Sequence, residues 1–302
     1  MKKFIYSLLL TVLLGIPLST KATIVDDPGV FNFSPFYDPS SGVSGLSLTF
    51  FPSEEGDTVY IPDYIYENNQ YKYVVCINTG AFFDCNAKYI RLPNHLRFIR
   101  DNAFHYCSFL TTLEFTNDIS EIDFGEIDDI VGGCNYVDEI IVPLQYLGNY
   151  IDDPDDRFFP FYLYEQLKGK TVLSQYNKMI WADVNFKVSS NVSSFYCTSV
   201  NNTTATANYN VNVVPANTAV CIIGDLGDEV YATATIDGAD NVAVSSSIIK
   251  VYNTTCISST TNNYYHFFDG VDTFYPISGS VCFEPHTAYL RSTETNEQII
   301  IQ

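Results

Sequence analysis

The chain has 302 residues, enough for two domains, and 46% of them are hydrophobic, so it can bury a substantial core. Its formal net charge of −20 repels the phosphates of nucleic acids and anionic lipids, so we expect no nucleic-acid partner. The 23 Tyr and 22 Phe, set against only 16 Gly, favour strands over helices.

Residues 1–22 have the pattern of a signal peptide. Lys2 and Lys3 supply a positive start, residues 4–18 are an apolar run, and Ala22 lies at a small-residue cleavage site. The run is shorter than the roughly 20 residues that a membrane-spanning helix needs. We therefore expect cleavage near Ala22, no membrane span, and a secreted or cell-envelope protein (periplasm, outer surface or extracellular).

A repeat follows in the first half of the chain. Ala81-Phe82 and Cys85 recur as Ala103-Phe104 and Cys107, in each case 22 residues later. A third, looser copy carries Cys134, 27 residues after Cys107. A period in the twenties is typical of a solenoid, in which coils too small to bury their own apolar side stack on one another.

Each copy contains a short segment with the period-2 alternation of a strand. The residues that we expect to point inward are Ile90 and Leu92, Leu113 and Phe115, and Ile140 and Val142. Val59 belongs to an earlier, capping coil, and Phe82 and Phe104 are expected to stack in the next row. After Pro143, residues 144–150 and 158–167 are predicted to be short helical or irregular pieces that close the solenoid.

Seven of the eight cysteines, all except Cys76, divide into two groups. Cys85, Cys107 and Cys134 occupy equivalent places in successive coils, which allows either metal or redox chemistry or a ladder of buried thiols. No C-x-x-C and no nearby His pair occurs, so buried reduced thiols are the favoured interpretation. Buried thiols are also favoured for the cysteines of the second half, with one disulfide among them as the alternative. Those four are Cys197, Cys221, Cys256 and Cys282.

From about Trp181 the composition changes to short alternating runs separated by turn residues such as Gly227-Asp228 and Asp237-Gly238, which indicates an antiparallel β-sandwich or barrel. The runs cover residues 184–188, 209–213, 219–223, 231–236 and 248–252. We therefore predict a mainly β protein. Its parts are a signal peptide (1–22), a leucine-rich-repeat domain with N-terminal capping strands (23–175) and a C-terminal β-sandwich-like domain (176–302).

The repeat resembles the BspA-type leucine-rich repeats of bacterial surface proteins. Ile99, followed by Ala103-Phe104 and Cys107, matches the family pattern closely, and the resemblance covers about residues 55–175. Residues 215–220, 274–277 and 285–290 resemble a C-terminal β domain that is common in secreted proteins of Gram-negative gut and oral anaerobes. The resemblance implies a right-handed coil stack and attachment to host matrix proteins or other cells.

No catalytic pattern stands out. The four histidines (His95, His105, His266 and His286) are scattered, and no nucleophile elbow or phosphate-cradling loop occurs. The acidic stretch 152–156 lacks the alternate-position carboxylates and Gly of a calcium loop. We therefore expect neither an enzyme nor a bound metal or cofactor.

The predicted function is a non-catalytic binding or adhesion protein, with an unknown protein or glycan as its ligand, on host matrix or another cell surface. The alternatives are a carbohydrate-binding accessory protein of the envelope and a hydrolase or protease inhibitor. Outward residues of the strands form two expected rows, one of Tyr60, Arg91, Glu114 and Ile141 and the other of Thr58, Tyr89, Thr112 and Glu139. The ligand is expected on Tyr60, Tyr89, Arg91, Thr112, Glu114 and Glu139.

Overall fold

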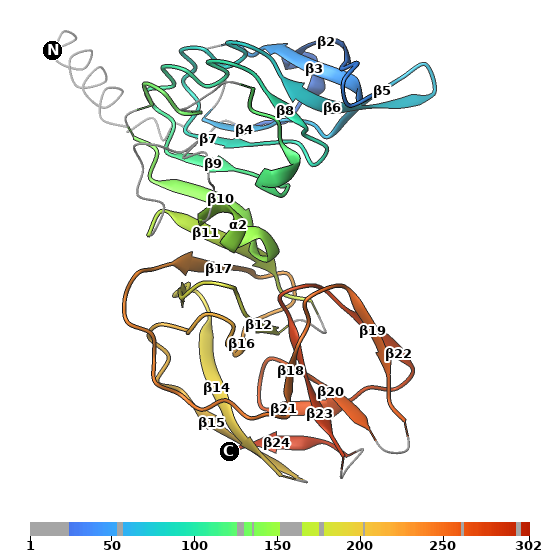
Figure 1. Ribbon diagram of the computed structural model, residues 1–302, viewed down its shortest axis with the longest axis vertical. Coiled ribbons are helices and arrows are strands. Elements are labelled where there is room, and N and C mark those ends of the chain that lie inside the picture. Colours follow the sequence, from blue (N-terminus) through green and yellow to red (C-terminus); the bar gives the residue numbers. More distant parts are fainter. Residues whose placement is uncertain are drawn as a thin grey trace, which may run out of the picture.

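The computed structural model describes residues 24–52, 57–125, 130–134, 136–151, 165–174, 178–201, 203–260, 263–293 and 297–302, and it is mainly β (Figure 1). The predicted signal peptide and the acidic stretch 152–156 lie outside the described residues. Within the described ranges, no helix is long and apolar enough to cross a membrane.

The predicted solenoid is confirmed by a parallel sheet of about four turns. Its strands pair in chain order and in register. They are β4 (Thr58–Tyr60), β7 (Tyr89–Arg91), β9 (Thr112–Glu114), β10 (Glu139–Pro143) and β11 (Leu167–Val172). The short strand β1 (Ile24–Val25) pairs with β4 and extends the sheet at its N-terminal end. Each coil thus adds one strand to a continuous ladder.

Stacked side chains form the core of the solenoid. The central residues of the strands, Val59, Ile90, Leu113 and Ile140, are at most 1% exposed. In the next row the Phe82 and Phe104 rings stack 5.3 Å apart, which confirms the prediction. Full burial of an aliphatic or aromatic side chain of this kind contributes about 1.5–3 kcal/mol. The stack is what holds coils of such small size together.

The three repeat cysteines form a ladder of buried thiols. Cys85, Cys107 and Cys134 are buried and carry no disulfide. The thiol of Cys107 donates to the carbonyl of Phe82 at 3.0 Å, and that of Cys134 donates to the carbonyl of Phe104 at 3.0 Å. The thiols of Cys107 and Cys134 therefore each contact a buried backbone carbonyl of the preceding coil, and the Cys85 thiol lies 3.3 Å from that of Cys107. A purely apolar side chain could not make these contacts. The Cys134 and Cys85 thiols, together with burial, raise the pKa of Cys107.

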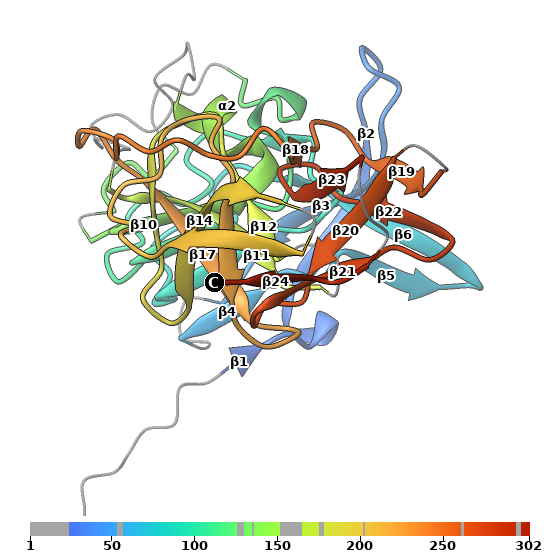
Figure 2. The same ribbon diagram turned by 90° about the horizontal axis from the view of Figure 1, so that it is seen from below.

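A second sheet lies beside the first coils. Its strands run in the order β2 (Asn32–Tyr37), β3 (Ser44–Phe50), β6 (Gln70–Ile77) and β5 (Tyr64–Glu67), and β8 (Phe98–Ile99) also pairs with β6. Single 3-10 turns occur at η1 (Pro28–Val30) and η2 (Ile119–Glu121). The β5–β6 hairpin projects from the body of the protein in both views (Figures 1 and 2).

The first piece predicted after Pro143 is helical, and most of the second, residues 158–164, lies outside the described residues. The 3-10 turn η3 (Leu144–Tyr146) and the helix α2 (Leu147–Ile151) agree with the prediction. The strand β11 was not predicted: it begins at Leu167 and adds another strand to the repeat sheet. Leu144 packs directly over it, because a Cβ atom at Gly169 would lie 2.9 Å from Leu144 Cδ1. Glycine is thus required where the helical cap crosses the sheet.

The repeat sheet continues into the second half of the chain. β17 (Glu229–Ala234) pairs antiparallel with β11 over five residue pairs, and β13 (Phe186–Val188) pairs antiparallel with β17. The result is one sheet of eight strands. Buried side chains of both halves, including Leu167 and Val230, belong to one hydrophobic core.

The remaining strands form mostly antiparallel sheets around a second core that contains Trp181, Phe195 and Phe274. The larger sheet holds β12 (Met179–Ile180), β14 (Ser193–Val200), β15 (Thr204–Asn208), β16 (Val220–Ile223), β18 (Ile248–Lys250), β20 (Tyr264–Phe268), β21 (Thr273–Pro276), β23 (Ala288–Ser292) and β24 (Ile299–Ile301). The prediction of a strand at residues 209–213 is wrong. Asn208 ends β15, and its side chain accepts from the amide of Asn210 in a turn.

A two-stranded ribbon of β19 (Thr255–Ser258) and β22 (Ser280–Phe283) carries a disulfide between Cys256 and Cys282. The buried-thiol interpretation is therefore wrong for this pair: the two cysteines lie directly opposite each other on the exposed side of the ribbon, whereas Val281 and Phe283 on its other side are buried in a small hydrophobic cluster. Cys197 and Cys221 are buried and free, as predicted.

Candidate ligand-binding face

The parallel register places the predicted ligand residues in two rows on the face of the sheet that points away from the solenoid core. Thr58 pairs with Tyr89, Tyr89 with Thr112, and Thr112 with Glu139. In the same way Tyr60, Arg91, Glu114 and Ile141 follow one another across the strands. All six predicted ligand residues thus lie on one face, because in-register parallel strands bring equivalent positions side by side.

The face is less open than the sequence suggests. Tyr60, Tyr89, Arg91 and Glu139 are half-buried, whereas Thr112, Glu114 and Ile141 are at most 9% exposed. The Tyr60 and Tyr89 rings meet edge to face with their centroids 5.8 Å apart. The aromatic end of the face and its outer strands are therefore what a ligand can reach directly.

A chain of polar contacts crosses the face and is centred on Glu114. The Tyr89 hydroxyl donates to its carboxylate, and Arg91 Nε lies 3.6 Å from Glu114 Oε1. From the other side Lys170 Nζ lies 3.4 Å from the same oxygen and 2.8 Å from Glu229 Oε1. The chain therefore links β7, β9, β11 and β17, and it joins the repeat sheet to the second half of the protein.

In each of these groups, burial shifts the pKa in one direction and the neighbouring opposite charges shift it in the other. Burial raises the pKa of Glu114, and the Lys170 ammonium limits the rise. Burial acts to lower the pKa of Lys170, but the Glu229 and Glu114 carboxylates outweigh it and the pKa is raised. The hydrogen bond from Lys170 lowers the pKa of Glu229. The network therefore keeps Lys170 charged at neutral pH.

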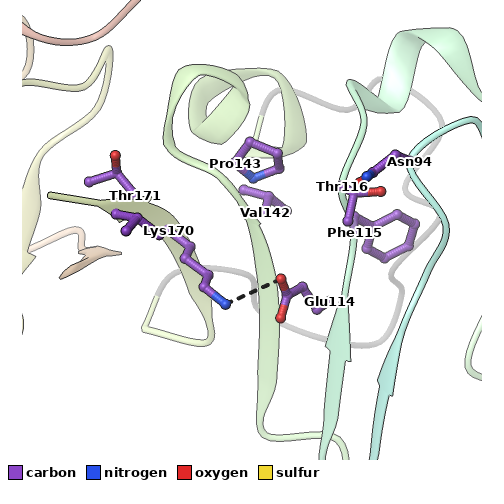
Figure 3. A pocket seen from close by; sticks show the side chains of 9 residues that line it. Asn94, Glu114, Phe115, Thr116, Val142, Pro143, Lys170 and Thr171 are labelled. Carbon is purple, nitrogen blue, oxygen red and sulfur yellow. Dashed lines mark hydrogen bonds and ion pairs between the residues drawn. The ribbon is translucent and has the colours of Figure 1, made fainter. Parts of the chain in front are cut away.

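A pocket of about 240 Å³ opens where β9, β10 and β11 end (Figure 3). Figure 3 shows the Glu114 carboxylate and the Lys170 ammonium facing each other at this pocket. Its lining consists of Asn94, Glu114, Phe115, Thr116, Val142, Pro143, Lys170, Thr171 and Val172. The volume lies below the 300–1,000 Å³ of typical small-molecule sites. It is suited to one side chain or one sugar ring of a larger ligand.

Comparison with protein families matches the chain to the BspA type leucine rich repeat region, in six copies over residues 58–148. We call residues 58–148 the BspA-type region, after the repeat family to which they are similar. Neither the curated proteins nor the solved structures contain a match to the chain.

The BspA-type region supplies β4, β7, β9 and β10, so every one of the six predicted ligand residues lies within it. The partners on β11 and β17 were missed by the sequence analysis. Lys168 contacts the carboxylate of Glu139, and Lys170 contacts Glu114 and Glu229. Leu167 and Gly169 alternate with Lys168 and Lys170 in the sequence, and this alternation was the available signal for a strand with two outward lysines.

The face is rich in aromatic and charged groups. It presents phenol rings, one guanidinium, carboxylates and ammonium groups that are already paired with one another. In the part of the chain that the structure describes, no group of three or more His, Cys, Asp or Glu is placed to hold a metal ion.

Proposed function

We propose that this protein is an exported, non-catalytic binding protein that engages a protein or glycan of host matrix or of another cell surface. The observation that best supports this proposal is the BspA-type repeat sheet. Its outer face presents the Tyr60–Tyr89 pair and a pocket lined by the Glu114–Lys170 ion pair. Repeat scaffolds of this kind typically use an extended sheet face for protein binding.

The dimensions of the face constrain the ligand. Eight strands about 4.8 Å apart and about 13 Å long give a face of roughly 500 Å². A standard protein–protein interface covers about 800 Å² on each partner. A protein ligand therefore has to contact neighbouring surfaces as well, bind weakly, or gain avidity from many copies on a cell. A short glycan or peptide fits the face alone.

A binding screen tests the proposal. The full chain is passed over immobilised extracellular-matrix proteins and a glycan array. Hits are repeated with a variant that carries Tyr60→Thr and Glu139→Gln. Both residues are half-buried and neither contacts Glu114, so the fold is expected to survive. The matched control carries Tyr37→Thr and Glu284→Gln at exposed positions away from the face.

We expect the face variant to lose about tenfold or more in affinity for the hit, because two side chains that contact the ligand in a small interface are removed, and the control to bind as the parent does. A hit whose affinity is the same in both variants would place the binding site elsewhere. The absence of any hit among matrix proteins and glycans would contradict the proposal.

A further inference from the structure

The β5–β6 hairpin carries a separate surface that the repeat face does not use. The antiparallel register pairs Tyr64 with Tyr73 and Tyr66 with Tyr71, so all four side chains point to one side of the hairpin. They are 45%, 43%, 57% and 60% exposed, in that order. The other side of the hairpin is anchored, since Ile65 packs against the main core. We call these four residues the tyrosine face.

The rings of the tyrosine face pack on one another. Tyr64 meets Tyr71 edge to face at 4.8 Å, and Tyr66 meets Tyr71 at 4.8 Å with the rings tilted by 48°. Rings set at such angles offer no flat platform on which a sugar can stack, but they expose π-faces and ring edges in several directions. Elsewhere the protein uses tyrosine hydroxyls internally, as Tyr150 does in donating to Asn117. Among the described residues, no hydrogen bond reaches any of the four hydroxyls of the tyrosine face.

The backbone of β5 is open along one edge. β5 ends its sheet, and in the described part of the chain it pairs with β6 alone. The amide of Val74 donates to the carbonyl of Asp63, and hydrogen-bonded and non-hydrogen-bonded pairs alternate along an antiparallel ladder. The pairs of Tyr64 and Tyr66 are therefore the non-hydrogen-bonded ones. Their N–H and C=O groups point to the open edge, and β5 has no Lys or Pro to block an added strand.

Charge decides which chain suits this edge. The chain carries a net charge of −20, so a second copy of the same chain is repelled and a basic partner is attracted. The one cation of the hairpin, Lys72, lies on the opposite side and pairs with Glu67 at 3.0 Å. The tyrosine face is therefore free of positive charge, and exposed tyrosine rings bind Lys and Arg side chains by cation–π attraction.

We infer that β5 binds an extended basic segment of a partner protein as an added strand, with Lys or Arg at alternate positions lying over Tyr64 and Tyr66. Alternation follows from the geometry, because every second side chain of an added strand points to the tyrosine face. This site is distinct from the repeat face, so either proposal can fail without the other.

Synthetic peptides of about ten residues test the inference with the intact protein. One peptide alternates Lys and Thr. A second has the same composition in two blocks, a third replaces Lys by Glu, and a fourth is the alternating peptide N-methylated at every second residue. Affinity is measured by fluorescence anisotropy at about 0.15 M salt, where long-range attraction is screened. We expect the alternating peptide to bind at least about tenfold tighter than the other three.

The matching protein variant carries Tyr64→Thr and Tyr66→Thr, since Thr keeps the strand propensity and removes the rings. The control carries Tyr37→Thr, on the opposite edge strand β2, and Tyr136→Thr; both residues are more than 60% exposed. The affinity of the hairpin variant for the alternating peptide is expected to be about tenfold lower than that of the parent, and the control is expected to bind the peptide as the parent does.

Several results would overturn the inference. Equal affinity for the alternating and block peptides would mean that the net charge of the peptide alone determines binding. Full binding of the N-methylated peptide would exclude strand addition. These two measurements use the unaltered protein and hold even if the hairpin variant fails to fold. Unchanged affinity in a folded hairpin variant would show that Tyr64 and Tyr66 do not contribute to peptide binding. Self-association in sedimentation, or a neutral glycan that competes at the hairpin, would assign the surface to another occupant.

Discussion

The carboxylate of Glu114 on β9 lies 3.4 Å from the ammonium of Lys170 on β11, across the intervening strand β10. The two residues are 56 positions apart in the sequence. Glu114 is 5% exposed, so its charge depends on partners supplied by the protein rather than by water. The candidate ligand face is therefore also a structural element of the sheet.

Replacing Lys170 by Met tests this relationship. The variant leaves the Glu114 carboxylate with Arg91 and Tyr89 alone, and we expect the free energy of unfolding to fall by about 1–3 kcal/mol. Urea denaturation measures it. Adding Glu114→Gln to Lys170→Met is expected to restore part of the loss, since the unpaired charge is then removed. A double variant as unstable as the sum of its singles would mean that the two groups do not interact.

Thiol titration tests the cysteine ladder and the disulfide together. The native protein is expected to react slowly with a thiol reagent at all six free cysteines, because each is buried and the thiolate of Cys107 is strongly disfavoured. Unfolding without reductant is expected to expose six thiols, and reduction of the Cys256–Cys282 bond to bring the number to eight. Rapid labelling of Cys107 in the native protein, or only four thiols after unfolding, would contradict this arrangement.

The stacked phenylalanines predict how the two halves melt. Phe104 is fully buried against Phe82, so Phe104→Ala is expected to cost roughly 3–5 kcal/mol. The proposed division at 175/176 predicts that residues 176–302 keep their own transition. The sheet that runs from β11 into β17 instead favours a transition shared by both halves. Calorimetry of the parent and the variant distinguishes independent from shared melting. A second transition whose temperature Phe104→Ala leaves unchanged supports the division, and one common transition contradicts it.

The close approach at Gly169 gives a further test. Gly169→Ala introduces a methyl group 2.9 Å from Leu144 Cδ1 and is expected to destabilise the protein by about 1–3 kcal/mol. In a Leu144→Ala background the contact with Leu144 Cδ1 is absent, so Gly169→Ala is expected to cost less there than in the parent. Gly238→Ala, where nothing lies within 4 Å, is the control and should leave the unfolding midpoint unchanged. A neutral Gly169→Ala would show that the cap and the sheet separate easily.

Buried histidines predict a loss of stability in mild acid. Burial lowers the pKa values of His266 and His286 below the ordinary value of 6.5. The unfolded chain therefore takes up protons that the folded chain does not, and the free energy of unfolding falls as the pH drops below about 6.5. We expect urea midpoints to decrease between about pH 7.5 and 5.5, and the decrease to shrink in a His266→Gln/His286→Gln variant. An identical pH slope in parent and variant would assign it to other groups.

The sequence alone determined what is local and repeated. The 22-residue spacing of Phe82 and Phe104 and the phase of Cys85, Cys107 and Cys134 were enough to predict a solenoid with stacked aromatic and thiol rows. Period-2 alternation was enough to place Tyr60, Arg91 and Glu114 on one face. These features follow from coil length and strand pleat, and neither depends on distant parts of the chain.

The tertiary structure decided everything that depends on contacts between distant residues. It placed Lys170 beside Glu114, brought β17 against β11, joined Cys256 to Cys282, and left the edge of β5 open. None of these pairs has a fixed spacing in the sequence. Long-range strand pairing is set by which apolar faces bury together in the whole fold, and local alternation reports only that a face exists.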